Sequence, residues 1–155
     1  ITLLGFVVGV MVMGCVSTPA KIIADMGVEK AIRVQLKKPV GELTKEDLTK
    51  VTSLYLANTK ITYAGLLDLS KLEKLTRLYL HNDTLTDSHI SEVAKLENLT
   101  ELNLTSAHVT DKSINELMNL KNLVEINLND THVTKEGVAR LQKALPKCRI
   151  HSHGN

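Results

Sequence analysis

The sequence predicts an α/β fold: a solenoid with parallel strands on one face, helices on the other and a helical cap at the N-terminus. Two observations predict it. Apolar residues recur with a period of 24 between Val51 and Ile150. Leucine also dominates the apolar residues, with 25 Leu in 155 residues against one Phe and no Trp. A core of so many leucines requires layered packing, because each repeated layer offers a slot of the same size.

The first residues have the character of a targeting segment. Residues 1–14 carry no charge and are mostly apolar. They are too few to span roughly 30 Å of hydrocarbon, which needs about 20 helical residues. They fit the apolar core of a signal peptide. Such peptides usually begin with a basic stretch and an initiator Met, both of which are absent here, and the sequence does not tell whether residues before Ile1 are missing.

The end of this segment resembles a bacterial lipobox, since Val12 lies three residues before Cys15 and the small Gly14 lies directly before it. The resemblance implies that residues 1–14 are cleaved and that Cys15 carries a lipid. Residues 15–20 would then tether an exported lipoprotein to a membrane of the bacterial cell envelope. The alternative is a plain signal peptide or membrane helix that happens to contain a cysteine.

Residues 21–50 are expected to form the helical cap. The apolar spacing of Val28, Ile32 and Leu36 predicts a helix over 28–36, ended by the Pro and Gly that follow at positions 39 and 41. A second short helix is expected after Thr44, which has the side chain of an N-cap and is followed by acidic residues. A solenoid needs such a cap to cover its first layer. The alternative is an amphipathic helix lying on the membrane.

Residues 51–155 are expected to hold four full repeats and a partial fifth, defined by eight columns of equivalent positions. The columns are Val51, Leu75, Leu99, Leu123; Leu54, Leu78, Leu102, Ile126, Ile150; Leu56, Leu80, Leu104, Leu128; Ile61, Leu85, Val109, Val133; Thr62, Thr86, Thr110, Thr134; Leu66, Ile90, Ile114, Val138; Leu69, Val93, Leu117, Leu141; and Leu72, Leu96, Leu120, Ala144. The alternating second and third columns predict a short strand with leucines inward. The threonine column predicts helix N-caps, helped by Asp87, Asp111 and Glu136 in the first helical turn.

Residues 51–150 resemble the leucine-rich repeat family, whose signature is L-x-x-L-x-L-x-x-N-x-L. The usual Asn is replaced by Thr59, Asp83, Ala107 and Thr131. We expect the polar ladder between coils to break at Ala107, which has no polar side chain. Residues 41–48 also resemble the N-terminal cap of bacterial internalin-like repeats. Cys148 is expected to fill the core as a small apolar residue.

Several chemistries have little support. Basic and acidic residues are interleaved at a net charge of +2, which argues against nucleic-acid binding. No motif indicates an enzyme or a cofactor. The column that holds His108 and His132, with Asp111 and Asp130 close in sequence, leaves a metal-dependent enzyme as a minor alternative. The other histidine pair, at positions 151 and 153, is expected to lie in a frayed polar tail, with a metal site at the open end as its alternative.

The outward face of the strands is the best candidate for function, because solenoids mostly serve as binding surfaces and because Tyr and Arg are common interface anchors. The candidate residues are Tyr55, Arg77, Tyr79, His81, Glu101, Asn103, Glu125 and Asn127, in columns that start with Ser53, Tyr55 and Ala57. The sequence therefore predicts a non-enzymatic protein-binding module with an unknown protein partner. A structural envelope lipoprotein with no dedicated ligand is the alternative.

Overall fold

The computed structural model describes residues 21–57, 59–81 and 84–153. The signal peptide, Cys15 and the tether expected over residues 1–20 lie outside the described residues. None of the helices in the described ranges is long and apolar enough to cross a membrane.

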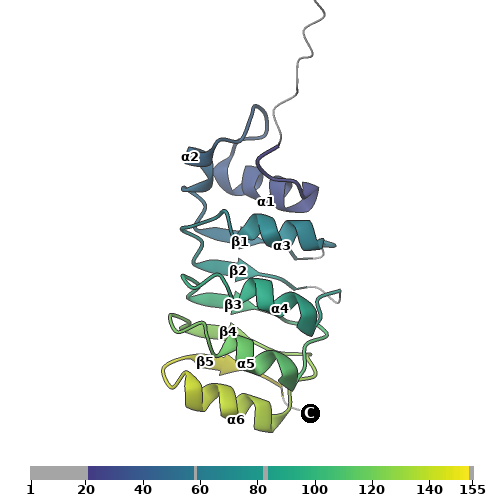
Figure 1. Ribbon diagram of the computed structural model, residues 1–155, viewed down its shortest axis with the longest axis vertical. Helices are drawn as coiled ribbons and strands as arrows, with labels where there is room; N and C mark the ends of the chain where they lie inside the picture. The colour runs from purple at the N-terminus through teal and green to yellow at the C-terminus, as the bar shows by residue number, and fades with distance from the viewer. Residues whose placement is uncertain (1–20, 58, 82–83, 154–155) are drawn as a thin grey trace, which may run out of the picture.

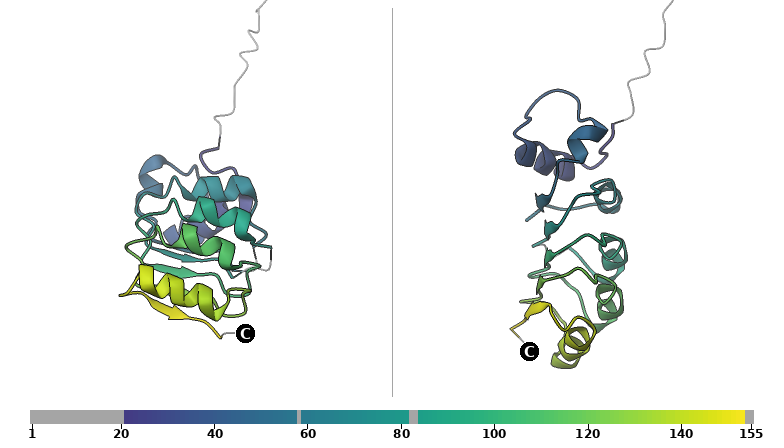
Figure 2. Two further views of the ribbon diagram at one scale, coloured as in Figure 1. Left: turned by 60° about the horizontal axis from the view of Figure 1, so that its bottom comes forward. Right: turned by 90° about the vertical axis from the view of Figure 1, so that its left-hand side faces the viewer.

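The described ranges form the expected α/β solenoid. The helices are α1 (Met26–Leu36), α2 (Lys45–Leu48), α3 (Tyr63–Leu69), α4 (Asp87–Val93), α5 (Ile114–Leu117) and α6 (Lys135–Ala144). The strands are β1 (Ser53–Tyr55), β2 (Arg77–Tyr79), β3 (Glu101–Asn103), β4 (Glu125–Asn127) and β5 (Arg149–His151). They pair in parallel, in chain order, within one sheet. The coils stack along the long axis with α1 and α2 at one end (Figure 1), and helices α3 to α6 lie on the side opposite the strands (Figure 2).

The 24-residue period sets the strand register, so each inward leucine lies beside its equivalent. Leu54 pairs with Leu78, Leu78 with Leu102, and Leu102 with Ile126. These side chains are buried in one continuous core. Cys148 is also buried there, as expected of a small apolar filler. The layered leucine core is therefore confirmed.

The cap helix α1 starts earlier than the apolar stripe suggests. It begins at Met26 rather than at the expected Val28, because the Asp25 carboxylate accepts hydrogen bonds from the Gly27 and Val28 N–H groups. It ends when Lys37 adopts a left-handed conformation with φ 53°, before the proline and glycine that were expected to end it.

The second cap helix, α2, confirms its expected start. Thr44 Oγ1 accepts from the Asp47 N–H, and the Asp47 carboxylate accepts in turn from the Thr44 N–H. This reciprocal pair satisfies two donors that a helix start otherwise leaves without partners.

Two carboxylates fix the cap to the first coil. Asp25 Oδ2 accepts from the Thr62 hydroxyl at 2.6 Å and from the Thr62 N–H at 3.2 Å. In the opposite direction, the buried Asp68 of α3 accepts from the backbone N–H groups of Ala24 and Asp25 at 2.7 and 2.8 Å. Lys71 lies 2.6 Å from the second oxygen of Asp68 and compensates its charge. The pose of α1 on the solenoid is thus set by hydrogen bonds as well as by apolar contact.

The same contact links later coils and corrects the role expected for Asp87 and Asp111. Each carboxylate was expected to serve its own helix, but each reaches the threonine of the next coil. Asp87 accepts from the N–H and hydroxyl of Thr110, both at 2.8 Å, and from the Ser113 hydroxyl. Asp111 accepts from the N–H and hydroxyl of Thr134 at 2.8 and 2.7 Å. We call these contacts, together with that of Asp25 to Thr62, the Asp–Thr ladder.

Thr131, in the column where the family's Asn forms a polar ladder between coils, does not bond to a neighbouring coil in the described part of the chain. Its hydroxyl donates to the Leu128 carbonyl, three residues earlier in the same coil, at 2.7 Å. Ala107 is buried and apolar, as its side chain requires. On the helix side the Asp–Thr column joins neighbouring coils, and at the other end of the coils Asn98 and Asn122 donate to the Glu73 and Glu97 carbonyls of the preceding coil. These contacts do not involve the position of Ala107.

The Asp–Thr ladder is interrupted once, where Tyr63 replaces the aspartate. The next threonine, Thr86, instead donates its N–H to Nδ1 of His89 in its own helix, at 3.0 Å. In the coils that receive a carboxylate the residue at the His89 position is small. At Gly65, for example, a Cβ atom would lie 2.8 Å from the Asp25 carboxylate. The larger His89 fits because no aspartate approaches it.

Two coils depart from the expected pattern. In the third coil a 3-10 turn over Asp111–Ser113 precedes α5, which shortens its α-helix. At the C-terminal end the expectation of a frayed tail is wrong for His151, which lies in β5. Its carbonyl accepts from the Leu128 N–H at 2.7 Å, and the His153 N–H donates to Asn129 Oδ1 at 2.9 Å.

The core gives a matched pair of substitutions in α3. Leu66 is 2% exposed and its chain neighbour Leu67 is 43% exposed. We expect Leu66→Ala to lower the free energy of unfolding by about 2–5 kcal/mol, because the stacked layers cannot close around the cavity. Leu67→Ala should cost about 0.5 kcal/mol or less. Chemical denaturation measures both, and equal losses would contradict the register.

The Asp–Thr ladder predicts acid sensitivity. Burial alone would raise the pKa of Asp87, but hydrogen bonds from Ser113 and Thr110 outweigh it and hold the pKa below the ordinary 3.8. The unfolded chain therefore binds this proton at higher pH than the folded chain. Stabilisation by Asp87 is complete above about pH 4 and is lost as the pH falls through the lower folded pKa.

We therefore expect Asp87→Asn to lower the free energy of unfolding at neutral pH and to flatten its decline between about pH 4 and pH 2. Denaturant titration across that range is the measurement. Glu97→Gln, at an exposed carboxyl, is the control and should keep the wild-type slope. An unchanged slope in Asp87→Asn would show that the ladder does not contribute to acid unfolding.

Candidate binding surface

The outward face of the sheet carries the candidate residues. The leucines of each strand point into the core, so the residues between them face outward. Tyr55, Arg77, Tyr79, Glu101, Asn103, Glu125 and Asn127 lie in β1 to β4, and His81 lies just after β2. The structure therefore brings all eight predicted residues onto one face.

Ser53 is the exception in the outward columns. It is 3% exposed, and its hydroxyl has no hydrogen-bond partner. The column was expected to be exposed throughout, but α1 packs against β1 and covers its first residue. The exposed part of that column therefore starts at Arg77.

An aromatic pair marks the N-terminal half of the face. The rings of Tyr55 and Tyr79 stack with centroids 4.3 Å apart and planes 3° from parallel. The Tyr79 hydroxyl donates to Glu101 Oε2 at 2.7 Å. The hydrogen bond to this carboxylate, with burial, raises the pKa of Tyr79 well above its ordinary 10.0. Tyr79 is thus held in place on both its ring and its hydroxyl, while Tyr55 is 61% exposed.

The C-terminal half of the face is polar and more loosely tied. Glu125 lies 3.2 Å from both Arg149 Nη1 and His151 Nε2, in exposed or half-exposed pairs. Exposed pairs of this kind contribute about 0–1 kcal/mol, so they set the charge of the surface more than its stability. The side-chain Oδ1 atoms of Asn103 and Asn127 accept hydrogen bonds from the backbone N–H groups of Thr105 and Asn129, two residues later in the chain. These side-chain oxygens therefore hold the turns that follow β3 and β4.

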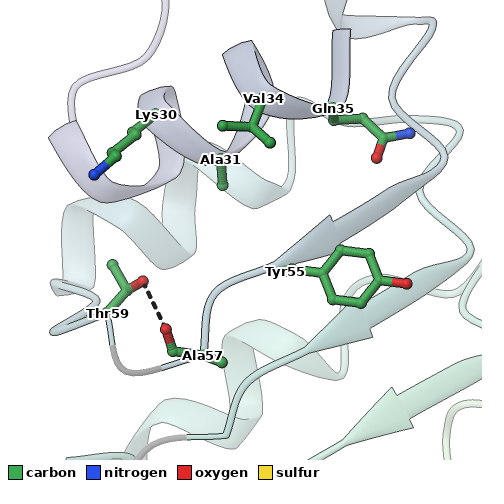
Figure 3. A pocket seen from close by; sticks show the side chains of 7 residues that line it. All are labelled: Lys30, Ala31, Val34, Gln35, Tyr55, Ala57 and Thr59. Carbon is green, nitrogen blue, oxygen red and sulfur yellow. Dashed lines mark hydrogen bonds between the residues drawn. The ribbon is translucent and has the colours of Figure 1, made fainter. Parts of the chain in front are cut away.

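A groove between the cap and the first strand extends this face (Figure 3). Its volume is about 490 Å³. Its lining residues are Lys30, Ala31, Val34 and Gln35 of α1, with Tyr55, Ala57 and Thr59 below them. The α1 side of this groove was missed from the sequence. The available signal was Val34, an apolar residue off the Val28–Ile32 stripe, and it is 71% exposed.

The histidine column does not form a metal site in the described part of the chain. The rings of His108 and His132 are neighbours, with centroids 5.6 Å apart. The carboxylate of Asp111 is committed to Thr134. Among the described residues, no group of three or more His, Cys, Asp or Glu side chains could hold a metal ion.

Comparisons with known proteins agree on the fold. No protein-family model and no curated protein matches the chain. Among solved structures, an internalin (inlF) from Listeria monocytogenes matches 91% of this chain, with a TM-score of 0.65 and 30% sequence identity. This chain spans only 40% of the length of that internalin.

A second solved structure, the actin-binding site 2 of leiomodin-1, matches 82% of this chain and 77% of its own, with a TM-score of 0.52. At 15% identity it is similar in fold alone. The fold of this protein is an internalin-like leucine-rich repeat solenoid.

The contact between Tyr79 and Glu101 predicts a titration. The Glu101 carboxylate stabilises the protonated phenol, so Glu101→Gln should lower the pKa of Tyr79 towards 10.0. Near-ultraviolet absorbance against pH measures it, and Tyr79→Phe identifies the step that belongs to Tyr79. Glu125→Gln, on the same face but not bonded to Tyr79, should leave the titration unchanged. An identical curve in Glu101→Gln would exclude this hydrogen bond in solution.

Proposed function

We propose that this leucine-rich repeat chain is a non-enzymatic protein-binding module, exported and held in the bacterial cell envelope by a lipid on Cys15. The observation that carries the binding proposal is the stacked Tyr55–Tyr79 pair on the strand face. Glu101 already fixes the Tyr79 side chain. Binding of a partner to this pair therefore costs little side-chain conformational entropy. Rigid aromatic anchors of this kind often dominate interface energies.

The size of the face limits how it binds. Five strands spaced by roughly 4.8 Å, each exposing roughly 15 Å, offer on the order of 300 Å². A standard interface buries about 800 Å² on each partner. A tight partner must therefore also contact the flanks of the sheet, where the groove beside α1 lies. The alternative, a structural envelope protein with no dedicated ligand, predicts that this face can be changed freely.

Export and anchoring are proposed from the lipobox-like Val12–Cys15 segment. Several acyl chains, at about 0.8 kcal/mol per buried CH₂, would hold the protein firmly to a membrane. The tether is short, so the cap end of the solenoid would lie nearest to the membrane and the strand face would remain open to partners.

The binding proposal predicts the result of a double substitution. We expect Tyr55→Ala with Tyr79→Ala to lose partners captured by chemical cross-linking in the producing cells, because the aromatic anchor is removed. The matched control is Tyr63→Ala, since Tyr63 lies on the helix side and is also exposed. Circular dichroism melting confirms folding of both variants. An unchanged set of cross-linked proteins in the double variant would favour the structural alternative.

The anchor proposal predicts a modified cysteine. We expect Cys15→Ser to abolish lipidation and to leave the protein uncut or released from the membrane fraction. Mass spectrometry of the membrane-extracted wild-type protein should find acyl groups at Cys15. Cys148→Ala is the control, because that thiol is buried in the core and should not affect membrane attachment. An unmodified Cys15 in wild-type protein would contradict the lipobox resemblance.

A further inference from the structure

We infer that the groove between α1 and β1 binds an extended peptide segment of a protein partner, which pairs with the open edge of β1 and stacks an aromatic side chain on Tyr55. The inference rests on the proposed binding function and names the chemistry of the partner. It is carried by the strand edge, the free ring face, the helix wall and the charge of the groove.

The open edge of β1 follows from its hydrogen bonds to β2. The Thr52 carbonyl accepts from the Arg77 N–H, and the Leu56 N–H donates to the Tyr79 carbonyl. In a parallel strand, alternate residues turn their backbone groups to opposite edges. The N–H and C=O of Tyr55 therefore point away from β2, towards the groove. Among the described residues β1 is the end strand of the sheet and pairs with β2 alone.

Strand edges with free backbone groups are sites where an extended peptide can add a strand. The first residue of β1, Ser53, is covered by the cap, whereas Tyr55 and Ala57 line the groove. The edge available for pairing is therefore short and begins where α1 leaves the strand.

The ring of Tyr55 offers a second contact. Tyr79 covers one of its faces, on the β2 side. The other face is turned away from β2, and Tyr55 lies open below Val34 and Gln35 (Figure 3). A planar side chain placed there would extend the stack by one ring, at the spacing that the coils already impose. Aromatic pairs of this geometry are stabilised beyond the area they bury.

The α1 side of the groove gives an apolar wall. Ala31 and Val34 line it, and Val34 is exposed although it is apolar. A volume of about 490 Å³ lies within the range of sites that enclose small ligands, so it suits one large side chain and the adjoining backbone.

The positive charge of the groove favours an acidic residue next to the aromatic residue of the bound peptide. Lys30 is the only charged residue among those lining the groove, and it forms no ion pair with any described residue. Arg77, the exposed residue of β2 paired with Ser53, adds a second positive charge to this end of the face. A partner segment with an acidic residue beside its aromatic residue complements this charge.

The experiment uses the full chain in detergent and a fluorescein-labelled probe, the capped hexapeptide Thr-Val-Asp-Tyr-Val-Thr. Fluorescence anisotropy measures its dissociation constant. We expect saturable binding with a dissociation constant below about 1 mM. Val34→Trp, which fills the groove, should raise that constant tenfold or more. Met26→Trp is the matched control, because Met26 lies on the same helix, is 81% exposed and does not line the groove. It should bind the probe like wild type.

Three altered probes test the chemistry. Replacing the peptide tyrosine by alanine, or its aspartate by lysine, should each weaken binding at least tenfold. A third probe carries N-methyl groups on the backbone nitrogens of the residues on either side of the tyrosine. If the peptide pairs with the strand edge, this probe should also bind at least tenfold more weakly than the parent peptide. Unchanged binding of the methylated probe would overturn edge pairing in favour of a side-chain pocket. No binding of the parent probe at about 1 mM would overturn the inference.

The cross-linking assay separates failure of this inference from failure of the proposed function. If Tyr55→Ala with Tyr79→Ala loses the partner but Val34→Trp keeps it, the strand face binds and the groove does not. If wild-type protein dimerises in sedimentation and Val34→Trp abolishes the dimer, the groove holds a second copy and the peptide inference is wrong.

Discussion

Directional hydrogen bonds between neighbouring coils, made by the parallel sheet on one side and by aspartate carboxylates on the other, are the constraint on which the arrangement of this solenoid depends. Asp25, Asp87 and Asp111 each accept both the N–H and the hydroxyl hydrogen of a threonine in the following coil. The leucine layers supply most of the burial, but apolar contact has no direction, so the relative position of neighbouring coils depends on hydrogen bonds. The parallel sheet provides them on the strand side. Between the first and second coils, where Tyr63 replaces the aspartate, the sheet supplies the directional contact. Where the aspartate is present, a two-pronged hydrogen bond to a charged group adds a directional contact on the helix side of the coil.

The same contact explains how the cap becomes part of the repeat. Asp25 belongs to the helical cap, yet its carboxylate performs for Thr62 what Asp87 performs for Thr110. It also caps its own helix, and its N–H is held by Asp68 from the first coil. Because these bonds fix α1, the helix lies at a set distance from β1, covers Ser53 and leaves the groove beside Tyr55.

The candidate binding surface is a product of that regular stacking. Equivalent residues of neighbouring coils meet at the strand spacing, so two tyrosines 24 residues apart stack without any local motif. Where the repeat sequence changes to Glu and Asn, the face becomes polar and its side chains bond to turns and to neighbouring charges. Aromatic character is thus concentrated near the cap, next to Val34, an apolar residue of α1 that is exposed to solvent. This coincidence makes the N-terminal end of the sheet the best-formed part of the face.

The sequence by itself determined the period, the inward leucines, the threonine positions before each helix and the outward columns with Tyr55 and Tyr79. These features depend on spacing along the chain, and spacing alone decides which face of a strand or coil a residue occupies. Only the tertiary structure decided that Asp87 and Asp111 bond forward to the next coil, that Ser53 is covered and that His151 lies in a strand. It also decided that Val34 forms a wall of a groove. Each of these depends on atoms brought together from separate coils or from the cap. The geometry of these contacts depends on how each coil is rotated relative to the next. The residue pattern within a single repeat does not determine that rotation.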